Sequence, residues 1–203
     1  MSKRILIVAD RLGCPSELIG VADTWTDRIL SKWSSNSNIF YTHCKCNLTL
    51  RDIELGYVSE IAPALIIMSV GIEDVYRGSL STGKWQFIQY IPIVGKFVNL
   101  VRNKYLMFVF RKIMRKIKKG TDAKIVFLAV PMPRRGINNK VCNIQGDIEN
   151  YNYVAKNIPD IIFLNPYKED SEVISEHNYL TLYGEDIVFS AIDNFLEQYL
   201  QDK

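Results

Sequence analysis

Charged side chains occur at three places that lie beside predicted strands or helices. Asp10 and Arg11 follow an apolar run near the N-terminus, Glu73 and Asp74 follow another apolar run, and a polar segment ending at Tyr179 precedes the last helix. Carboxylates can accept protons or bind hydroxyl groups, and an arginine fork can bind a carboxylate or a phosphate. Together these residue types predict a polar site for hydrolysis or for ligand binding.

The elements that must position these residues alternate between strands and helices. Apolar, β-branched runs predict strands at about 5–8, 38–42, 64–70, 124–130 and 160–164. Helical spacing predicts helices at about 23–34, with Asp23 or Thr24 as the N-cap, from Thr49 or Asp52 to 61, and at about 97–118, 144–156 and 183–200. Alternation of this kind predicts crossover connections and a parallel sheet. We expect an α/β fold, a three-layer α/β/α sandwich with five strands in the flavodoxin-like order 2-1-3-4-5. Its site should lie at the carboxyl ends of the strands.

The segment Ala9-Asp10-Arg11-Leu12, directly after the first predicted strand, resembles the G-D-S-L block of the SGNH (GDSL) hydrolases. The family's nucleophilic serine falls on Arg11. The resemblance implies the SGNH hydrolase fold and an ancestry in ester hydrolysis or acyl transfer on carbohydrate. It also implies that the nucleophile is replaced by a residue that cannot attack an ester.

A second block follows the third predicted strand as Gly71-Ile72-Glu73-Asp74 and resembles the family's G-x-N-D. The resemblance makes Gly71 and Glu73 the oxyanion-equivalent positions, with Glu73 in place of the asparagine. An ionised carboxylate accepts hydrogen bonds and cannot donate one, so it would repel a developing oxyanion. This position therefore opposes the chemistry of the family.

The last block, before the final helix, resembles D-x-x-H-L-(S/T)-x-x-G, with Leu180, Thr181 and Gly184 in agreement. The catalytic aspartate falls on Glu176 and the catalytic histidine on Tyr179. A tyrosine is a poor general base at neutral pH because its ordinary pKa is about 10. The glycine block of the family has its counterpart at 42–49, where this chain carries no glycine.

The preferred interpretation is a pocket that binds and does not cleave. We expect Arg11 to lie among Glu73, Asp74 and Glu176, and the ligand-binding candidates are Asp10, Arg11, Asp74 and His177. The ligand would be a saccharide or a nucleotide-sugar. The alternative is an active carbohydrate esterase or acyltransferase that uses a carboxylate such as Asp10 or Glu176.

A narrower resemblance concerns three short segments: Asp-Arg-Leu-Gly-Cys-Pro from Asp10, Asp-Thr-Trp from Asp23, and Gly-Ile-Glu-Asp from Gly71. Together they look like the SGNH-like proteins of bacterial surface-polysaccharide (capsule or O-antigen) gene clusters. This resemblance implies an accessory, carbohydrate-binding role in polysaccharide biosynthesis.

A basic and apolar stretch, an insertion or long helix at about 78–119, separates the third and fourth predicted strands. No acidic residue occurs between Asp74 and Asp122, whereas lysines and arginines concentrate at 102–119. One interpretation is a crossover helix with its cations in solvent. The other is a helix that rests on an anionic membrane surface or on an acidic protein partner, and the stretch could equally be lid or core.

Composition limits the remaining possibilities. The 203 residues, 48% hydrophobic and 23% charged with a net charge of +3, predict one soluble domain spanning 1–203. No secretory signal is visible, so we expect a cytoplasmic protein with reduced cysteines. His43-Cys44-Lys45-Cys46 lacks the further ligands of a zinc site, so no metal or other cofactor is expected. Nucleic acid is not an expected partner, because no recognised binding fold accompanies the basic stretch.

Overall fold

The computed structural model describes residues 3–34, 38–78, 92–132, 140–167, 171–175 and 179–201. Its centre is a five-stranded sheet built from β1 (Arg4–Ala9), β2 (Ile39–Cys44), β3 (Leu65–Ser69), β4 (Lys124–Leu128) and β5 (Ile161–Leu164). The strands run in the order β2-β1-β3-β4-β5 and every neighbouring pair is parallel. This topology confirms the predicted fold.

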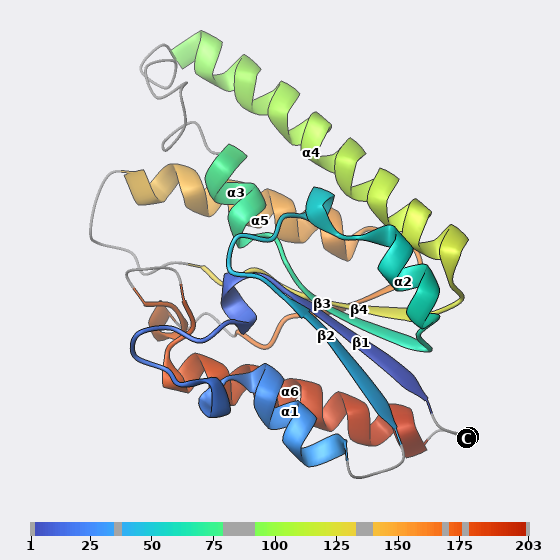
Figure 1. Cartoon of the computed structure of the whole chain (residues 1–203). Coiled ribbons are helices and arrows are strands. Elements are labelled where there is room, and N and C mark those ends of the chain that lie inside the picture. Colours follow the sequence, from blue (N-terminus) through green and yellow to red (C-terminus); the bar gives the residue numbers. More distant parts are fainter. Residues whose placement is uncertain are drawn as a thin grey trace.

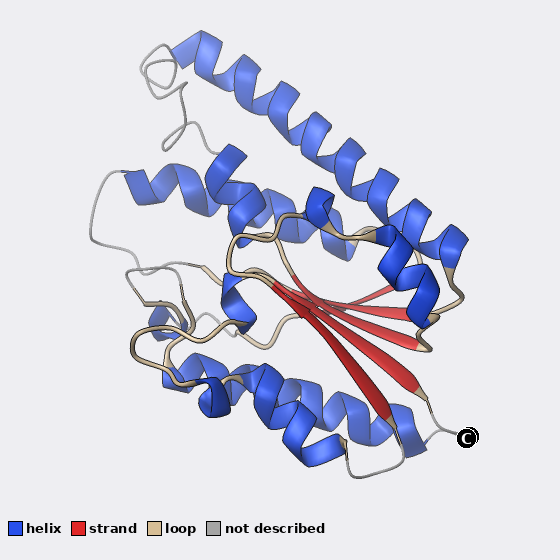
Figure 2. Cartoon of the chain, in the orientation of Figure 1, coloured by secondary structure: helices blue, strands red, loops and turns tan. Residues whose placement is uncertain are grey.

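Helices cover both faces of the sheet (Figures 1 and 2). One layer contains α1 (Trp25–Trp33) and α6 (Leu182–Gln201). The other contains α2 (Leu55–Ile61), α3 (Ile72–Gly78), α4 (Pro92–Gly120) and α5 (Lys140–Lys156). Short 3-10 turns lie at η1 (Arg11–Gly13), η2 (Val21–Asp23), η3 (Leu50–Asp52) and η5 (Ser171–Val173).

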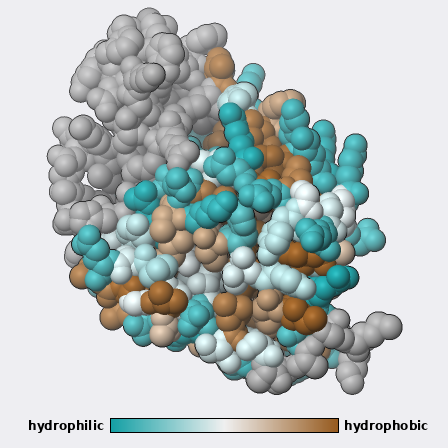
Figure 3. Space-filling model, viewed as in Figure 1, coloured by the Kyte–Doolittle hydropathy of each residue, from teal (hydrophilic) through white to brown (hydrophobic). Residues whose placement is uncertain are grey.

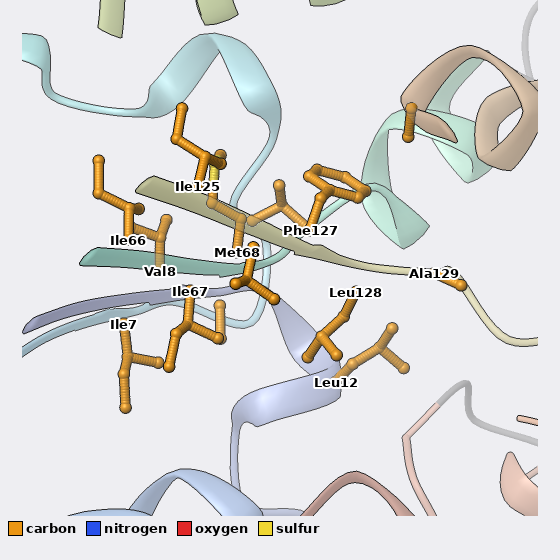
Figure 4. Close-up of a cluster of buried hydrophobic side chains, with 14 of the residues drawn as sticks. Ile7, Val8, Leu12, Ile66, Ile67, Met68, Ile125, Phe127, Leu128 and Ala129 are labelled. Atoms are coloured by element: carbon orange, nitrogen blue, oxygen red, sulfur yellow. The ribbon is translucent and has the colours of Figure 1, made fainter. Parts of the chain in front are cut away.

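Side chains of the central strands alternate between the two layers, as a strand requires. In Figure 4, Met68 and Phe127 point to the layer of α4 and α5, and Ile67 and Leu128 point to the layer of α1 and α6. All four are buried. Because both faces of the sheet are covered, the central strands β1, β3 and β4 carry buried apolar runs, which is why they could be recognised in the sequence.

The start of α1 is fixed by its cap and by α6. Thr24 is the N-cap, as predicted, and its hydroxyl accepts the N–H of Asp27 at 3.3 Å. The carboxylate of Glu185, which is buried in α6, accepts the N–H of Trp25 at 2.6 Å. Helix α6 therefore caps the first turn of α1 across the layer.

The helix predicted over 52–61 is broken in the structure. Residues Leu50–Asp52 form the separate turn η3, which Asp52 closes by accepting the N–H of Thr49 at 3.0 Å. Helix α2 begins only at Leu55 and ends where Ala62 adopts a left-handed φ of 44° before Pro63. Helices α4 and α5 each begin several residues earlier than predicted. Residues 79–91, at the start of the basic and apolar stretch predicted at about 78–119, lie outside the described residues.

Candidate functional site

The candidate site lies at the carboxyl ends of β1 and β3, where the predicted topology places it. Asp10 follows β1 and caps η1, which begins at Arg11. Gly71 and Glu73 lie at the start of α3, just after β3, and Tyr179 lies close before α6. Glu176 and His177, the two other predicted site residues, lie outside the described residues.

Asp10 connects the loops that follow β1 and β3. Its carboxylate is fully buried and accepts three backbone N–H groups, from Leu12 at 3.0 Å, Gly71 at 2.9 Å and Ile72 at 3.0 Å. Burial raises the pKa of Asp10 from 3.8 to about 7, although the three hydrogen bonds favour the ionised form. The sequence suggested that this carboxylate contacts a ligand or acts as a base. The structure instead places it beneath the site as a backbone anchor.

The Asp10 anchor requires an unusual backbone at Gly71. Its φ of +136° lies in a region that favours glycine, and a Cβ atom there would collide with the ring of Tyr151. The Tyr151 hydroxyl donates to the carbonyl oxygen of Val70 at 3.4 Å, so the ring is fixed against this loop. Gly71 can therefore donate its N–H to Asp10 because it has no side chain that would collide with Tyr151.

Arg11 and Glu73 form an ion pair at the surface of the site. The Nη2 atom of Arg11 lies 2.6 Å from Oε1 of Glu73, and the two side chains are 29% and 10% exposed. The guanidinium carbon of Arg11 also lies 5.3 Å from the centre of the Tyr179 ring, which is a cation–π distance. The structure thus brings together the cation, the carboxylate and the phenol that were predicted to occupy one pocket.

Asp74 contacts a different part of the chain. Its Oδ2 atom accepts the N–H of Leu50 at 2.9 Å, which holds η3 against the start of α3. This contact gives Asp74 a role in positioning the loop, in addition to the ligand-binding role predicted for it.

Three cysteines adjoin the site, and the sequence analysis did not place them there. Cys46, which is exposed, neighbours the buried Cys14 and Tyr179, and it adds to the rise that burial causes in the pKa of each. Burial raises the pKa of the Cys14 thiol above its ordinary range and that of Cys44 to about 11. The available signal was positional, since Cys14 lies shortly after Arg11, Cys44 ends β2 and Cys46 follows two residues later. All three cysteines are free.

A second buried carboxyl group, that of Glu185, was also missed by the sequence analysis. Burial raises its pKa from 4.5 to about 7, while the N–H of Trp25 and the charge of Arg28 favour the ionised form. Glu185 and Asp10 both add to the raised pKa of the buried Tyr167 phenol. Among the residues described, no three histidine, cysteine or acidic side chains are arranged to hold a metal ion.

Comparison with solved structures identifies the fold. The crystal structure of TesA superposes with a TM-score of 0.66 at 12% identity, covering 97% of this chain and 99% of that one. An acetyl-xylooligosaccharide esterase, Axe2, from Geobacillus stearothermophilus gives 0.65 at 13% identity over 96% and 93% of the two chains. A lipolytic G-D-S-L family protein from Veillonella parvula gives 0.62 at 8% identity over 94% and 96%.

The chain has the SGNH hydrolase fold. Neither the family models nor the curated proteins compared with the sequence match it. Structural similarity at 8 to 13% sequence identity establishes the fold but does not establish the reaction. In an SGNH fold, the motif resemblance assigns Arg11, Glu73 and Tyr179 to the nucleophile, oxyanion and base positions. The residue types at these positions must therefore decide the function.

Proposed function

We propose that this SGNH-fold protein binds a carbohydrate without hydrolysing it and acts as an accessory component of bacterial surface-polysaccharide biosynthesis. The observation that carries the proposal is the 2.6 Å ion pair between Arg11 and Glu73. A guanidinium stays protonated and does not attack esters, and a carboxylate cannot donate a hydrogen bond to an oxyanion. Ester cleavage would need different groups at both positions.

The same three side chains suit the recognition of sugar hydroxyl groups. The ion pair offers N–H donors from Arg11 and carboxylate acceptors from Glu73, and a vicinal pair of hydroxyls can use one of each. The ring of Tyr179 adds an apolar face against which a pyranose can pack. Since the pair is neutral as a whole, a neutral saccharide fits without displacing Glu73, whereas the phosphates of a nucleotide-sugar would compete with Glu73 for Arg11.

Ligand-observed NMR tests this proposal with two classes of probe. Acetylated xylo-oligosaccharides represent neutral saccharides, and UDP-glucose represents nucleotide-sugars. We expect saturation transfer to a saccharide that Tyr179→Ala and Glu73→Gln each weaken. Lys32→Ala, which removes a cation in contact with an acid in the α1–α6 layer, serves as the control. Saturation transfer to UDP-glucose alone would show that the ligand is a nucleotide-sugar and not a neutral saccharide. Saturation transfer to neither probe would contradict the binding function.

An active esterase is the second candidate, and the position of Cys46 favours it. This exposed thiol neighbours Tyr179, whose ring centre lies 5.3 Å from the guanidinium carbon of Arg11, so a group that can act as a nucleophile exists near the pair. Turnover of p-nitrophenyl acetate that Cys46→Ser abolishes and Cys44→Ser preserves would support this function. Asp10 is the weaker nucleophile because its carboxylate is enclosed by backbone N–H groups.

A further inference from the structure

Helix α4 has one face that packs on the protein. Phe110, Met114 and Ile117 recur at helical spacing and are buried. The ring of Phe110 lies 5.1 Å from that of Phe127 in β4 and 5.5 Å from that of Tyr151 in α5, measured between centroids. These contacts fix the rotation of α4 about its axis, and they determine which of its side chains face outward.

The outward face of α4 combines aromatic and basic side chains. Tyr105 and Phe108 are 53% and 61% exposed, although both are large and apolar enough to be buried. Exposed lysines and arginines share this face on both sides of the two rings: Lys104 before them, and Arg111, Lys112, Arg115, Lys116 and Lys119 after them. In Figure 3, hydrophilic side chains project beside hydrophobic surface where α4 crosses the upper part of the view.

Cations lie directly against the exposed aromatic rings. Nζ of Lys112 is 5.9 Å from the centroid of Phe108, and the guanidinium carbon of Arg51 is 5.0 Å from that of Tyr105. Arg51 comes from η3, so the basic face extends beyond the helix. A hollow of about 600 Å³ follows this face and is lined by Phe108, Met107 and the neighbouring lysines and arginines.

The charge on this face is out of proportion to that of the whole protein. No acidic residue occurs between Asp74 and Asp122, and the chain carries a net charge of only +3. The helix dipole stabilises cations only in the last turn of a helix, so in α4 it explains the presence of Lys118 and Lys119 but not of the other cations. The remaining cations form one localised positive surface that is balanced by acids elsewhere in the chain.

We propose that the outward face of α4, together with Arg51 of η3, docks on an anionic lipid surface. Aromatic side chains that penetrate the headgroup region, next to lysines and arginines that reach lipid phosphates, are the combination that interfacial helices use. An acidic protein would be matched by the charges alone and would leave the exposure of Tyr105 and Phe108 unexplained. Among the helices that the structure describes, none combines the length and the hydropathy that crossing a bilayer requires.

Flotation with lipid vesicles tests the proposal. The full chain is mixed with phosphatidylcholine vesicles that either contain or lack phosphatidylserine, at low and at high sodium chloride. We expect flotation only with phosphatidylserine, and loss of flotation at high salt because exposed charges are screened. Arg111→Glu/Lys112→Glu should weaken binding roughly tenfold or more, and Phe108→Ser should weaken it at unchanged net charge.

The control is Lys45→Glu/Lys156→Glu, which makes the same change in net charge at exposed positions outside α4. Circular dichroism confirms that each variant is folded. Equal loss of binding in the control, or flotation that does not depend on phosphatidylserine, would overturn the proposal. Retention on polyglutamate through Arg111 and Lys112, without flotation on any vesicle, would overturn it in favour of an acidic protein partner.

Discussion

The guanidinium of Arg11 pairs with the carboxylate of Glu73 at 2.6 Å, across the loops that follow β1 and β3. Arg11 and Glu73 lie far apart in the sequence, so the ion pair forms only when β1 and β3 are adjacent in the sheet. By motif resemblance, Arg11 occupies the nucleophile position and Glu73 occupies an oxyanion position. Neither residue type suits hydrolysis at its position.

Breaking the pair from one side should destabilise the protein more than replacing both partners. Arg11→Leu leaves the Glu73 carboxylate, which is only 10% exposed, without this cation, and we expect a loss of about 1–2 kcal/mol. Arg11→Leu/Glu73→Leu should recover part of that loss, because no unpaired charge remains. Urea denaturation measures both. A double variant no more stable than Arg11→Leu alone would contradict this account.

Gly71 and Gly146 should respond in opposite directions to alanine. Gly71→Ala introduces a side chain at φ +136° against the Tyr151 ring and disturbs the backbone that Asp10 holds, at a cost of about 3 kcal/mol. Gly146 lies within α5 with no atom in reach of an added Cβ, so alanine there should stabilise by about 0.5–1 kcal/mol. Thermal denaturation would refute the Gly71 role if both variants behaved alike.

Glu185 should make stability depend on pH in an identifiable direction. Its pKa is raised from 4.5 to about 7 in the folded protein, so the folded state holds a proton that the unfolded state has released. Stability should therefore fall as pH rises from about 4.5 to 7, by at most about 3 kcal/mol, and should not fall further above that range on account of this group.

The test of Glu185 is urea denaturation of the wild type and of Glu185→Gln across that pH range. Glutamine keeps an oxygen that accepts the N–H of Trp25 and cannot ionise, so the variant should show a flatter profile. Asp10, whose pKa is also raised to about 7, supplies a remaining slope of the same sign. An identical slope in the two proteins would show that Glu185 does not retain its proton.

The cysteines should differ in their reactivity toward a maleimide at neutral pH. Cys46 is exposed, whereas Cys14 is buried with a raised pKa and Cys44 is largely enclosed with a pKa of about 11. In mass spectrometry after brief labelling, peptides containing Cys46 should be modified well before those of the other two. Faster labelling of Cys14 would mean that the loop after β1 is open, contrary to its packing here.

The fold could be predicted from the sequence because its central strands β1, β3 and β4 are buried on both faces. Runs such as Ile5 to Val8 and Leu65 to Met68 are continuously apolar, and their alternation with helices fixes a parallel topology. The break between η3 and α2 could not be predicted in the same way. It depends on side-chain bonds of Asp52 and Asp74 to backbone N–H groups, which helical periodicity does not encode.

The sequence predicted which residues lie together in the site better than it predicted the role of each residue. Motif order was enough to bring Arg11, Glu73 and Tyr179 together. The role of Asp10 depends on three backbone N–H groups that the loops direct at its carboxylate. The sequence does not distinguish an aspartate that is buried in this way from one that is exposed to a ligand. The contact between Cys46 and Tyr179 likewise joins residues far apart in the chain, and no spacing rule connects them.

The most direct test of the central claim is the hydrolysis of p-nitrophenyl acetate by the wild type and by Arg11→Ser/Glu73→Asn/Tyr179→His. The triple variant restores the residue types that the motif resemblance assigns to the three positions. Arg28→Ser/Asp186→Asn, which alters a 2.6 Å ion pair between α1 and α6, is the matched control. We predict that the wild type and the control hydrolyse the ester no faster than buffer, and that the triple variant exceeds both. Turnover by the wild type that the triple variant loses would contradict the account.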